Sequence, residues 1–468
     1  MIFASLIFLY LFLPLNLIIY FFSKSQNTKN AVLLVFSLVF YAWGRPAWML
    51  LLVFTAWCDW RNARYIEKHR GTRRAKAAFA ASLIFDIGVF VLFKYTGFFA
   101  ENINFLFKSV LPVPEFELPI GISFYTFQTL TYVIDVYRGT SKAQTRFSRY
   151  LLYLSMYFQL VAGPIVRYSD VEKEINVRNH SVQAAYAGMQ RFLCGLAKKV
   201  ILADTAGVLA KKYMESDPAS LPLLAAWLGS FMYIIQLYFD FSGYSDMAIG
   251  LGKIFGFRFP ENFNYPYISK SVSEFWRRWH MTLGGFFRDY VYIPLGGNRK
   301  HVFFNLFVVW FLTGFWHGAS WNFILWGLYN GLFIALERLF KQPFERIPAF
   351  FRHIYLLLVV DIGFVFFYFK DIRRAFAYLG AMFGAKTLTN TDFSVTFMNN
   401  VFFIVLAVVL CAPLSQGIKQ LSARIERRSA FMTCTVSVVR GVSLAAILAV
   451  CTALLAGNSY SPFLYFQF

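Results

Sequence analysis

Residues 2–22 read IFASLIFLYLFLPLNLIIYFF, a nearly unbroken apolar run. A run of this length is what an α-helix needs to cross the hydrocarbon core of a bilayer. No basic residue precedes the run and no small-residue cleavage site closes it, so we expect a retained first span and no cleaved signal peptide. Because backbone polar groups in lipid must pair within their own segment, the run predicts a helical membrane protein.

The composition extends this prediction to the whole chain. Of the 468 residues, 58% are hydrophobic and 20% are aromatic. This is far more apolar surface than a soluble core of this size needs, and it excludes a water-soluble protein. The high aromatic content is typical of interfacial belts and of wide cavities lined by protein.

Further apolar segments predict roughly eleven transmembrane helices in all. After the first, they are centred near Val89, Leu154, Leu196, Tyr233, Phe287, Phe307, Leu325, Leu358, Val405 and Ala446. Gly and Pro interrupt several of them, and irregular backbone at membrane depth is tolerated only where protein or water surrounds it. We therefore expect an all-α polytopic membrane protein with re-entrant or interfacial helices around a central tunnel.

The charge balance gives the expected orientation. Lys and Arg number 45 against 24 Asp and Glu, a net charge of +21. In a membrane protein such an excess marks cytoplasmic loops, which is a better reading here than nucleic-acid binding. Basic residues between Lys419 and Arg440 precede the last apolar segment, residues 441–457, so one pass through the membrane would place the C-terminus outside.

Polar side chains inside apolar stretches need a reason, because burying them in a membrane costs free energy. In residues 119–338, Gly163-Pro164 must break a helix and leave Arg167 beside the break. Asp240 and Asp246 fall on adjoining faces of one predicted helix. They suit a proton path or a cation site, and hydrogen bonding between helices explains them equally well.

Residues 274–280 read EFWRRWH. On a helix, Glu274 meets the two following arginines, while Trp276 and His280 share a face. The segment fits an amphipathic helix at the cytoplasmic interface, and it also fits an active role for His280. Nearby arginines offer bidentate forks suited to the phosphates of coenzyme A. These residues are Arg277, Arg278 and Arg288.

Residues 312–323 read LTGFWHGASWNF and contain the sharpest candidate, His317. If a helix starts after the basic residues 299–301, His317 lies sixteen residues on, or roughly 24 Å along the axis. Gly314 and Gly318 would let another helix or a ligand come close, and Thr313 and Trp321 bracket the histidine at four-residue spacing. A lone buried histidine is commonly a core residue, but at membrane depth we favour a general base.

Several motifs in one order resemble the membrane-bound O-acyltransferase family, in its bacterial branch of alginate and peptidoglycan O-acetylation subunits. The motifs are GPIVRY at residues 163–168, YFDFSGYSDMA at 238–248, PENFN at 260–264, FWRRWH at 275–280 and WHGA at 316–319. The two family histidines fall on His280 and His317. The resemblance implies helices around a thinned membrane centre, with an acyl-CoA site open to the cytoplasm and acetyl-CoA as the expected donor.

The resemblance also implies a bacterial cytoplasmic (inner) membrane location and an SGNH-type acetyltransferase partner outside the membrane. On this basis we expect N-terminal transmembrane helices in residues 1–116, a catalytic core in 117–341 and C-terminal transmembrane helices in 342–468. The acceptor is expected to be an extracytoplasmic polysaccharide, such as an alginate-like polymer or peptidoglycan.

Two other functions remain open from the residues alone. A proton-coupled transporter would use Asp240, Asp246 and His317 as a relay, and a non-catalytic scaffold would only hold a secreted acetyltransferase. Zinc, nucleotide-loop and serine-hydrolase motifs are absent from the sequence, and we expect no metal. The five cysteines are scattered, with neither disulfide nor metal spacing.

The chain ends in SPFLYFQF, residues 461–468, which is either an interfacial aromatic anchor or a functional motif. It resembles the Phe-x-Tyr-x-x-Phe ending on a small subunit of the teichoic-acid D-alanylation system, where such a tyrosine is implicated as an acyl relay. We therefore expect Tyr465 to accept the acyl group through His317 and to pass it to a serine of the partner. A neutral imidazole within reach would activate the phenol.

Overall fold

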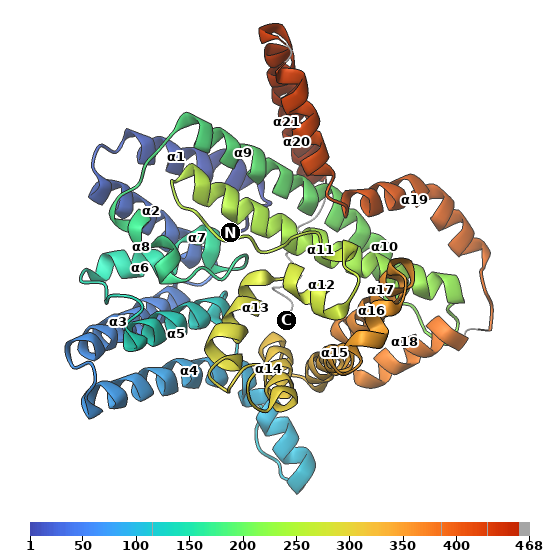
Figure 1. Ribbon diagram of the computed structural model, residues 1–468, viewed down its shortest axis with the longest axis horizontal. Coiled ribbons are helices and arrows are strands. Elements are labelled where there is room, and N and C mark those ends of the chain that lie inside the picture. Colours follow the sequence, from blue (N-terminus) through green and yellow to red (C-terminus); the bar gives the residue numbers. More distant parts are fainter. Residues whose placement is uncertain (115, 385, 428, 458–468) are drawn as a thin grey trace.

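The computed structural model describes residues 1–114, 116–384, 386–427 and 429–457 (Figure 1). These residues fold into helices and connecting loops, and no strand occurs among them. In the first half of the chain, the helices are η1 (Phe8–Phe12), α1 (Leu13–Phe22), α2 (Gln26–Ala42), α3 (Pro46–Lys68), α4 (Arg73–Phe107), α5 (Ile122–Arg138), α6 (Phe147–Ser155), α7 (Tyr157–Leu160), α8 (Tyr168–Asn176), α9 (Val182–Ala197), η2 (Lys198–Ala203) and α10 (Asp204–Met214). The second half contains α11 (Leu223–Ile254), η3 (Pro266–Ile268), α12 (Val272–Arg278), α13 (Met281–Phe287), η4 (Arg288–Tyr292), α14 (Val302–His317), α15 (Trp321–Leu339), α16 (Lys341–Arg346), α17 (Ala349–Tyr368), α18 (Ile372–Gly384), α19 (Thr391–Leu410), α20 (Leu414–Glu426) and α21 (Ala430–Gly457).

Five of the described helices, α4, α11, α17, α19 and α21, are long and apolar enough to cross a membrane. The segments Phe8–Phe22 and Val302–His317 are apolar but shorter. The prediction of an all-α polytopic membrane protein is therefore confirmed. Two of the predicted apolar segments fold as short helices, α6 near Leu154 and α13 near Phe287. Nine residues of α6 span only about 14 Å at the helical rise, so α6 cannot cross the bilayer by itself.

The helices are arranged around α11, which is buried along most of its length (Figure 1). Helix α9 lies alongside α11, α1 to α8 lie to the left in this view, and α14 to α18 lie below and to the right. The first half of α11, up to Phe239, packs into an apolar core shared with α15, α17 and α18. From Phe241 onward, α11 packs into a second core shared with the N-terminal helices. The molecule thus has two apolar cores that meet beside α11.

Small residues allow α9 to lie directly against α11. A Cβ atom added at Gly195 would stand 2.5 Å from the carbonyl oxygen of Gly243, and one at Gly188 would stand 2.6 Å from that of Gly250. Such contacts are too short for any side chain, so close packing of the two backbones requires glycine here.

The carboxylates of α11 pair with basic residues across the same interface. Asp240 lies 2.8 Å from Nζ of Lys199, and Asp246 pairs with Arg191 at 2.9 Å and Lys198 at 2.6 Å. Each carboxylate is therefore held by a cation of α9 or η2, which supports the helix-contact alternative that the sequence left open.

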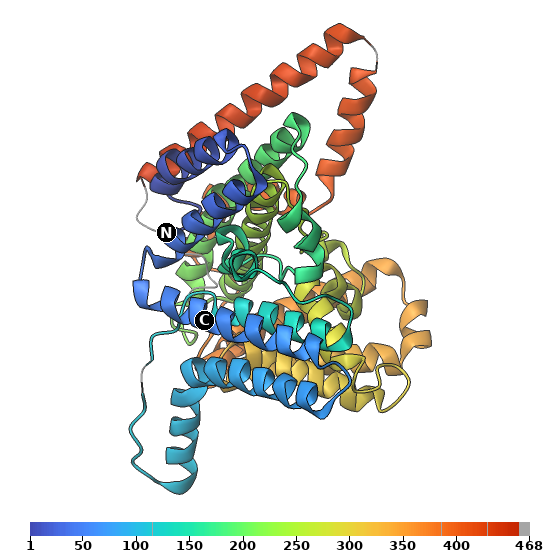
Figure 2. The same cartoon turned by 90° about the vertical axis from the view of Figure 1, so that its left-hand side faces the viewer.

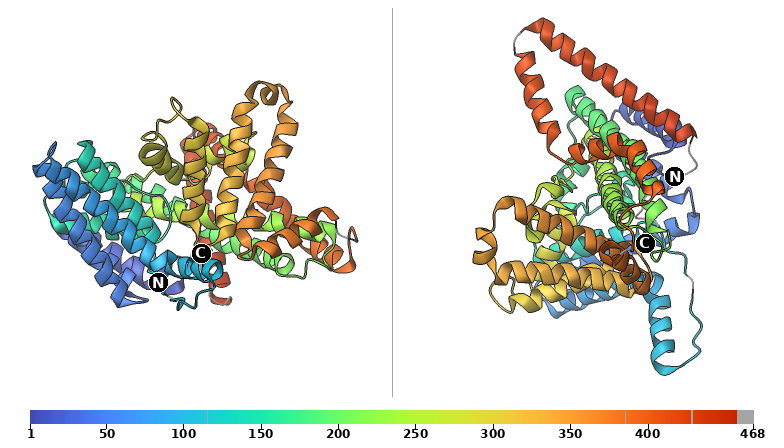
Figure 3. Two further views of the ribbon diagram at one scale, coloured as in Figure 1. Left: turned by 90° about the horizontal axis from the view of Figure 1, so that it is seen from below. Right: turned by 90° about the vertical axis from the view of Figure 1, so that its right-hand side faces the viewer.

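The C-terminal helices extend from this body in two directions. Helix α15 packs between α14 and α17, and the three lie side by side (Figure 3). The hairpin of α20 and α21 stands out from the body, and α21 returns to pack against α9 (Figure 2).

Candidate active site

His317 is the last residue of α14, where the helix stops inside the protein. The helix begins at Val302, directly after His301, so the predicted start and the sixteen-residue offset are confirmed. Gly318 is extended, with φ −165° and ψ 153°, and it ends the helix. The buried imidazole lies among aromatic rings, with ring centroids 4.9 Å from Trp316, 5.0 Å from Trp326 and 5.2 Å from Phe367.

Glycines let α15 approach the histidine as expected. A Cβ atom at Gly314 would lie 2.4 Å from the carbonyl oxygen of Phe323, and one at Gly318 would lie 2.2 Å from the Phe323 ring. The predicted bracketing of His317 by Trp321 on one helix is wrong, because α14 ends at His317 and Trp321 begins the next helix, α15. The close approach of α15 brings Trp326 against the imidazole in its place.

His280 lies at a helix break, and this corrects the helix predicted for residues 274–280. Helix α12 ends at Arg278, and His280 takes a left-handed conformation, with φ 44°, before α13 begins at Met281. Trp276 and His280 therefore do not share a helix face. A non-glycine residue at positive φ is strained and occurs often at functional sites. The break turns the imidazole inward, where it is 3% exposed.

A chain of hydrogen bonds fixes the tautomer of His280. The backbone N–H of Ile165 donates to Oγ1 of Thr282 at 2.9 Å, so the Thr282 hydroxyl is directed to donate to Oδ1 of Asn262, also at 2.9 Å. The backbone N–H of Thr282, which can only donate, contacts the same atom of Asn262 at 3.4 Å and identifies it as Oδ1, while Nδ2 donates to Ser245 at 3.0 Å. Nδ1 of His280, 3.1 Å from Oδ1, must therefore carry the proton.

The other ring nitrogen of His280 is left as a lone-pair acceptor. Nε2 is buried and has no hydrogen-bond partner among the described residues. Buried polar atoms without partners are rare in native proteins and call for an explanation. A substrate hydroxyl would donate a hydrogen bond to this atom, so the geometry makes His280 a second candidate base.

Both histidines line one cavity of about 180 Å³. Its wall is mainly aromatic and apolar, and Arg288, Thr313 and Tyr292 supply polar groups. The lining residues are Trp276, Trp279, His280, Leu283, Gly284, Phe287, Arg288, Tyr292, Leu306, Val309, Trp310, Thr313 and His317. The cavity lies where the two apolar cores meet, since Trp279 belongs to one core and Leu283 to the other. Apolar walls with a few convergent polar groups are typical of small-molecule sites.

Residues 141–377 match the family model described as membrane-bound O-acyltransferase, and the match contains both histidines. Over its full length, the chain is 37% identical to a probable alginate O-acetylase of Azotobacter vinelandii, which is also covered completely. The chain belongs to the membrane-bound O-acyltransferase family. A probable alginate O-acetylase of Pseudomonas aeruginosa is 41% identical over 83% of the chain and 76% of the relative. A peptidoglycan O-acetyltransferase of Helicobacter pylori is 33% identical over 82% of the chain and 80% of the relative.

The predicted phosphate-binding arginines of this acyltransferase lie in different places. Arg288 lines the cavity, whereas Arg277 is exposed and does not line it. Arg278 pairs with Glu274 at 2.9 Å, as the sequence predicts, and it also donates to the backbone of Asn264. The structure thus brings Arg288 together with His280 and His317, and it leaves Arg277 and Arg278 outside the cavity wall.

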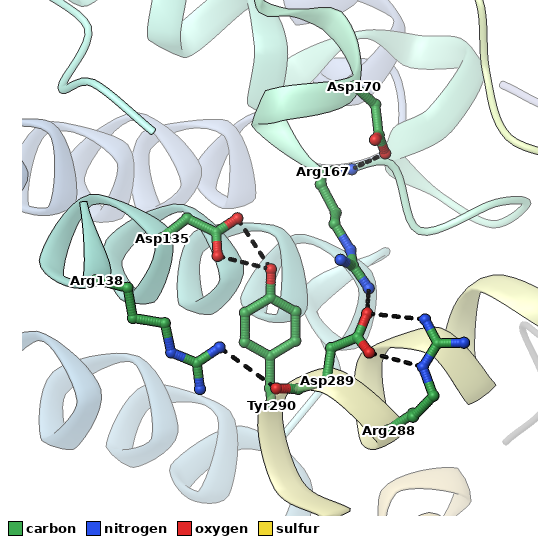
Figure 4. Close-up of polar contacts among 7 residues, drawn as sticks. All are labelled: Asp135, Arg138, Arg167, Asp170, Arg288, Asp289 and Tyr290. Atoms are coloured by element: carbon green, nitrogen blue, oxygen red, sulfur yellow. Dashed lines mark hydrogen bonds and ion pairs between the residues drawn. The ribbon is translucent and has the colours of Figure 1, made fainter. Parts of the chain in front are cut away.

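Arg288 belongs to a polar network that the sequence does not reveal (Figure 4). Asp289 accepts hydrogen bonds from Arg288 at 2.7 Å and from Arg167 at 2.7 Å, and Arg167 follows the Gly163-Pro164 break. Hydrogen bonds from Arg288 lower the pKa of Asp289, and Arg167 lowers it further against the opposing effect of burial. The network ties the cavity rim to the irregular segment that carries Ile165.

Tyr290 completes the network on its other side. Its hydroxyl donates to both oxygens of Asp135 at 2.9 Å, and the guanidinium groups of Arg138 and Arg167 stand over its ring (Figure 4). Arg138 also donates to the backbone carbonyl of Asp289 at 3.3 Å. Three helical segments that are far apart in sequence are therefore joined at this end of the cavity.

Two features of the site lie outside the candidates named from sequence. Asn262 falls in the PENFN motif, which the resemblance quotes without a role, and a buried polar residue in a family motif is the feature that could have identified it. Lys94, a single cation in the apolar stretch 80–100, contacts the backbone of His317. Tyr465 lies outside the described residues. Within the described ranges, no three His, Cys, Asp or Glu side chains gather as metal ligands would.

Proposed function

We propose that this chain is an O-acetyltransferase that takes an acetyl group from cytoplasmic acetyl-CoA and delivers it for O-acetylation of an extracytoplasmic polysaccharide. The observation that carries the proposal is the shared cavity, which His280 and His317 both line and which has Arg288 on its wall. The names of the relatives, probable alginate O-acetylases and a peptidoglycan O-acetyltransferase, support acetyl as the group and a polysaccharide as the acceptor.

We assign the general base to His317. The acceptor hydroxyl gives its proton to the imidazole nitrogen, and its oxygen forms a bond to the thioester carbonyl carbon. The C–S bond breaks, and the CoA thiolate leaves and takes up the proton. His280, whose Nε2 is an acceptor held in place by Asn262, receives a hydrogen bond from the reacting hydroxyl or shares the proton. The aromatic walls exclude water, which would otherwise hydrolyse the thioester.

The donor end of the cavity is assigned to Arg288. Its guanidinium group can form paired hydrogen bonds with a phosphate of CoA, and the adjacent Arg138 and Arg167 add positive charge. The cavity of about 180 Å³ fits the thioester end of a donor with a short acyl chain. Arg277 and Arg278 can contribute only outside the cavity wall, at the surface where the rest of the donor would lie.

On the acceptor side, we propose that Tyr465 is an acyl relay. In this proposal the C-terminus is extracytoplasmic, the phenol accepts the acetyl group from CoA with His317 as base, and an SGNH-type acetyltransferase partner takes it onward. The protein acts in the bacterial cytoplasmic (inner) membrane, with residues 117–341 as the catalytic core between the N-terminal (1–116) and C-terminal (342–468) transmembrane helices.

Proteoliposomes containing the purified protein test the proposal. Acetyl-CoA labelled in the acetyl group is added on one face, and we follow release of the CoA thiol and transfer of label to protein. Without the partner, mass spectrometry should find an acetyl ester on Tyr465, and Tyr465→Phe should lose it while still folding. Full polymer acylation by Tyr465→Phe in the presence of the partner would reduce the C-terminal motif to an anchor and return the partner's serine as the direct acceptor. Proton-coupled solute uptake in the absence of acyl-CoA, with no thiol release in its presence, would favour a transporter. Normal polymer acylation by His317→Ala would favour a scaffold.

A further inference from the structure

The end of α14 at His317 is held by side chains from α4, more than two hundred residues earlier in the chain. Nζ of Lys94 donates to the carbonyl oxygen of Trp316 at 2.8 Å and to that of His317 at 3.1 Å. The hydroxyl of Tyr95 donates to the carbonyl oxygen of Phe315. Two neighbouring residues of α4 therefore satisfy three consecutive carbonyl groups at the helix terminus.

These carbonyl groups need partners because the helix stops inside the protein. The last four carbonyls of an α-helix have no amide donor within the helix, and leaving them buried and unpaired is costly. Many helices solve this with a following turn, but here Gly318 is extended and no backbone cap bond forms. The Lys94 ammonium group replaces that turn, and its positive charge also suits the negative end of the helix dipole.

Lys94 has no other evident reason to lie in an apolar helix. It is partly buried within α4, which is long and apolar enough to cross a membrane, and no carboxylate of the described residues pairs with it. Its ammonium group also stands over the rings of Phe90 at 5.7 Å and Trp316 at 5.9 Å. A cation placed at such cost in a membrane span usually has a functional role.

We propose that Lys94 is a positioning residue for His317. By holding the carbonyls of Trp316 and His317, it fixes the last turn of α14, and through that turn it sets where the imidazole stands in the cavity. The contact to the Trp316 ring also fixes the residue before His317, whose ring centroid lies 4.9 Å from the imidazole. Tyr95 supports the same turn one residue earlier. This inference rests on the proposed function for its catalytic consequence, while the structural link itself is independent of it.

The test compares Lys94→Met with Lys76→Met in the full-length purified protein. Both changes remove an ammonium group from α4, but Lys76 is exposed and makes no contact with the site. Thermal unfolding first establishes that each variant is folded. We expect Lys94→Met to lower kcat for acetyl transfer by about 10- to 100-fold with little change in KM for acetyl-CoA, because misplacing a catalytic group by about 1 Å has an effect of that order. Lys94→Arg, which can still donate to two carbonyls, should restore part of kcat.

Hydrogen exchange gives a readout that does not depend on the reaction. In Lys94→Met, backbone amides of residues 314–320 should exchange faster than in Lys76→Met, while amides elsewhere in α14 should not change. Unchanged exchange, together with a kcat within threefold of the parent, would overturn the positioning role even if His317→Ala is inactive. Should the parent show no acetyl transfer at all, the proposed function fails, and the exchange data alone still decide whether Lys94 holds the helix end.

Discussion

Oδ1 of Asn262 accepts a hydrogen bond from Nδ1 of His280 at 3.1 Å, and this contact decides which nitrogen of the imidazole carries the lone pair. Thr282, held by the backbone of Ile165, keeps Oδ1 of Asn262 in the acceptor orientation. The irregular segment after Gly163-Pro164 therefore reaches the histidine through two side chains. The Gly163-Pro164 motif, which the sequence explains simply as a helix break, thus takes part in orienting a candidate catalytic group.

Removing Asn262 should impair the reaction more than the fold. We expect Asn262→Ala to lower kcat by about 10- to 100-fold, because the imidazole loses the partner that fixes its tautomer and its position. The matched control is Asn264→Ala, two residues away, whose side chain is exposed. Equal kcat values for the two variants, measured by thiol release from acetyl-CoA, would show that the Asn262 contact does not matter for His280.

Arg288 should affect the binding of the donor and not the chemical step. We expect Arg288→Ala to raise KM for acetyl-CoA by about three- to fivefold with kcat held, since an exposed charge pair contributes up to about 1 kcal/mol. Arg277→Ala is the comparison, because Arg277 is exposed and lies outside the cavity wall. If Arg277→Ala raises KM as much as Arg288→Ala does, the donor phosphates lie outside the cavity rim. No change in either variant would remove both arginines from the donor site.

The sequence predicts the position of His317 on its helix well, but it predicts little of the surroundings of His280. Basic residues 299–301 followed by an apolar run place the start of α14 correctly, and helical rise then gives the distance of His317 along the helix. The break at His280 involves no Gly or Pro, the residues that usually mark such a break, so periodicity extends α12 too far. Its positive φ is stabilised by tertiary contacts, which local sequence does not encode.

Contacts between segments far apart in the chain are the other feature that the sequence does not predict. The α11 acids could be assigned to helix contacts only as one of two alternatives, because their partners on α9 and η2 lie about 40 to 55 residues away along the chain. Lys94 and the end of α14 are separated by 222 residues, and the spacing of neither segment indicates that they meet. The division of the chain into three parts at residues 116 and 341 stays a prediction.

The Asp289 network gives a prediction of pH dependence. Because the pKa of Asp289 in the folded protein is lowered, chiefly by Arg288, its stabilising contribution is complete above the pKa of an unfolded aspartate, near 4, and is lost as pH falls through the lower folded value. Asp289→Asn should therefore lower the unfolding temperature by a similar amount from pH 8 to about pH 5. The difference from the parent should shrink only below about pH 4.

Thermal unfolding in detergent at several pH values measures this difference. The ion pair between Arg45 and Glu117 is exposed at the surface and offers a control. Glu117→Gln should have little effect on the unfolding temperature at any pH. A difference between parent and Asp289→Asn that disappears already near pH 6 would show that another group controls the network.

The rate of acetyl transfer by His317→Ala tests the central claim most directly. The parent, His317→Ala and His280→Ala are purified to the same folded fraction, judged by their unfolding curves, and thiol release and label transfer from acetyl-CoA are measured under saturating donor. A positioned base contributes about 10²- to 10⁴-fold, so we expect His317→Ala to lose at least about 100-fold in kcat. A folded His317→Ala protein whose kcat stays within about tenfold of the parent would contradict the assignment of His317 as the general base.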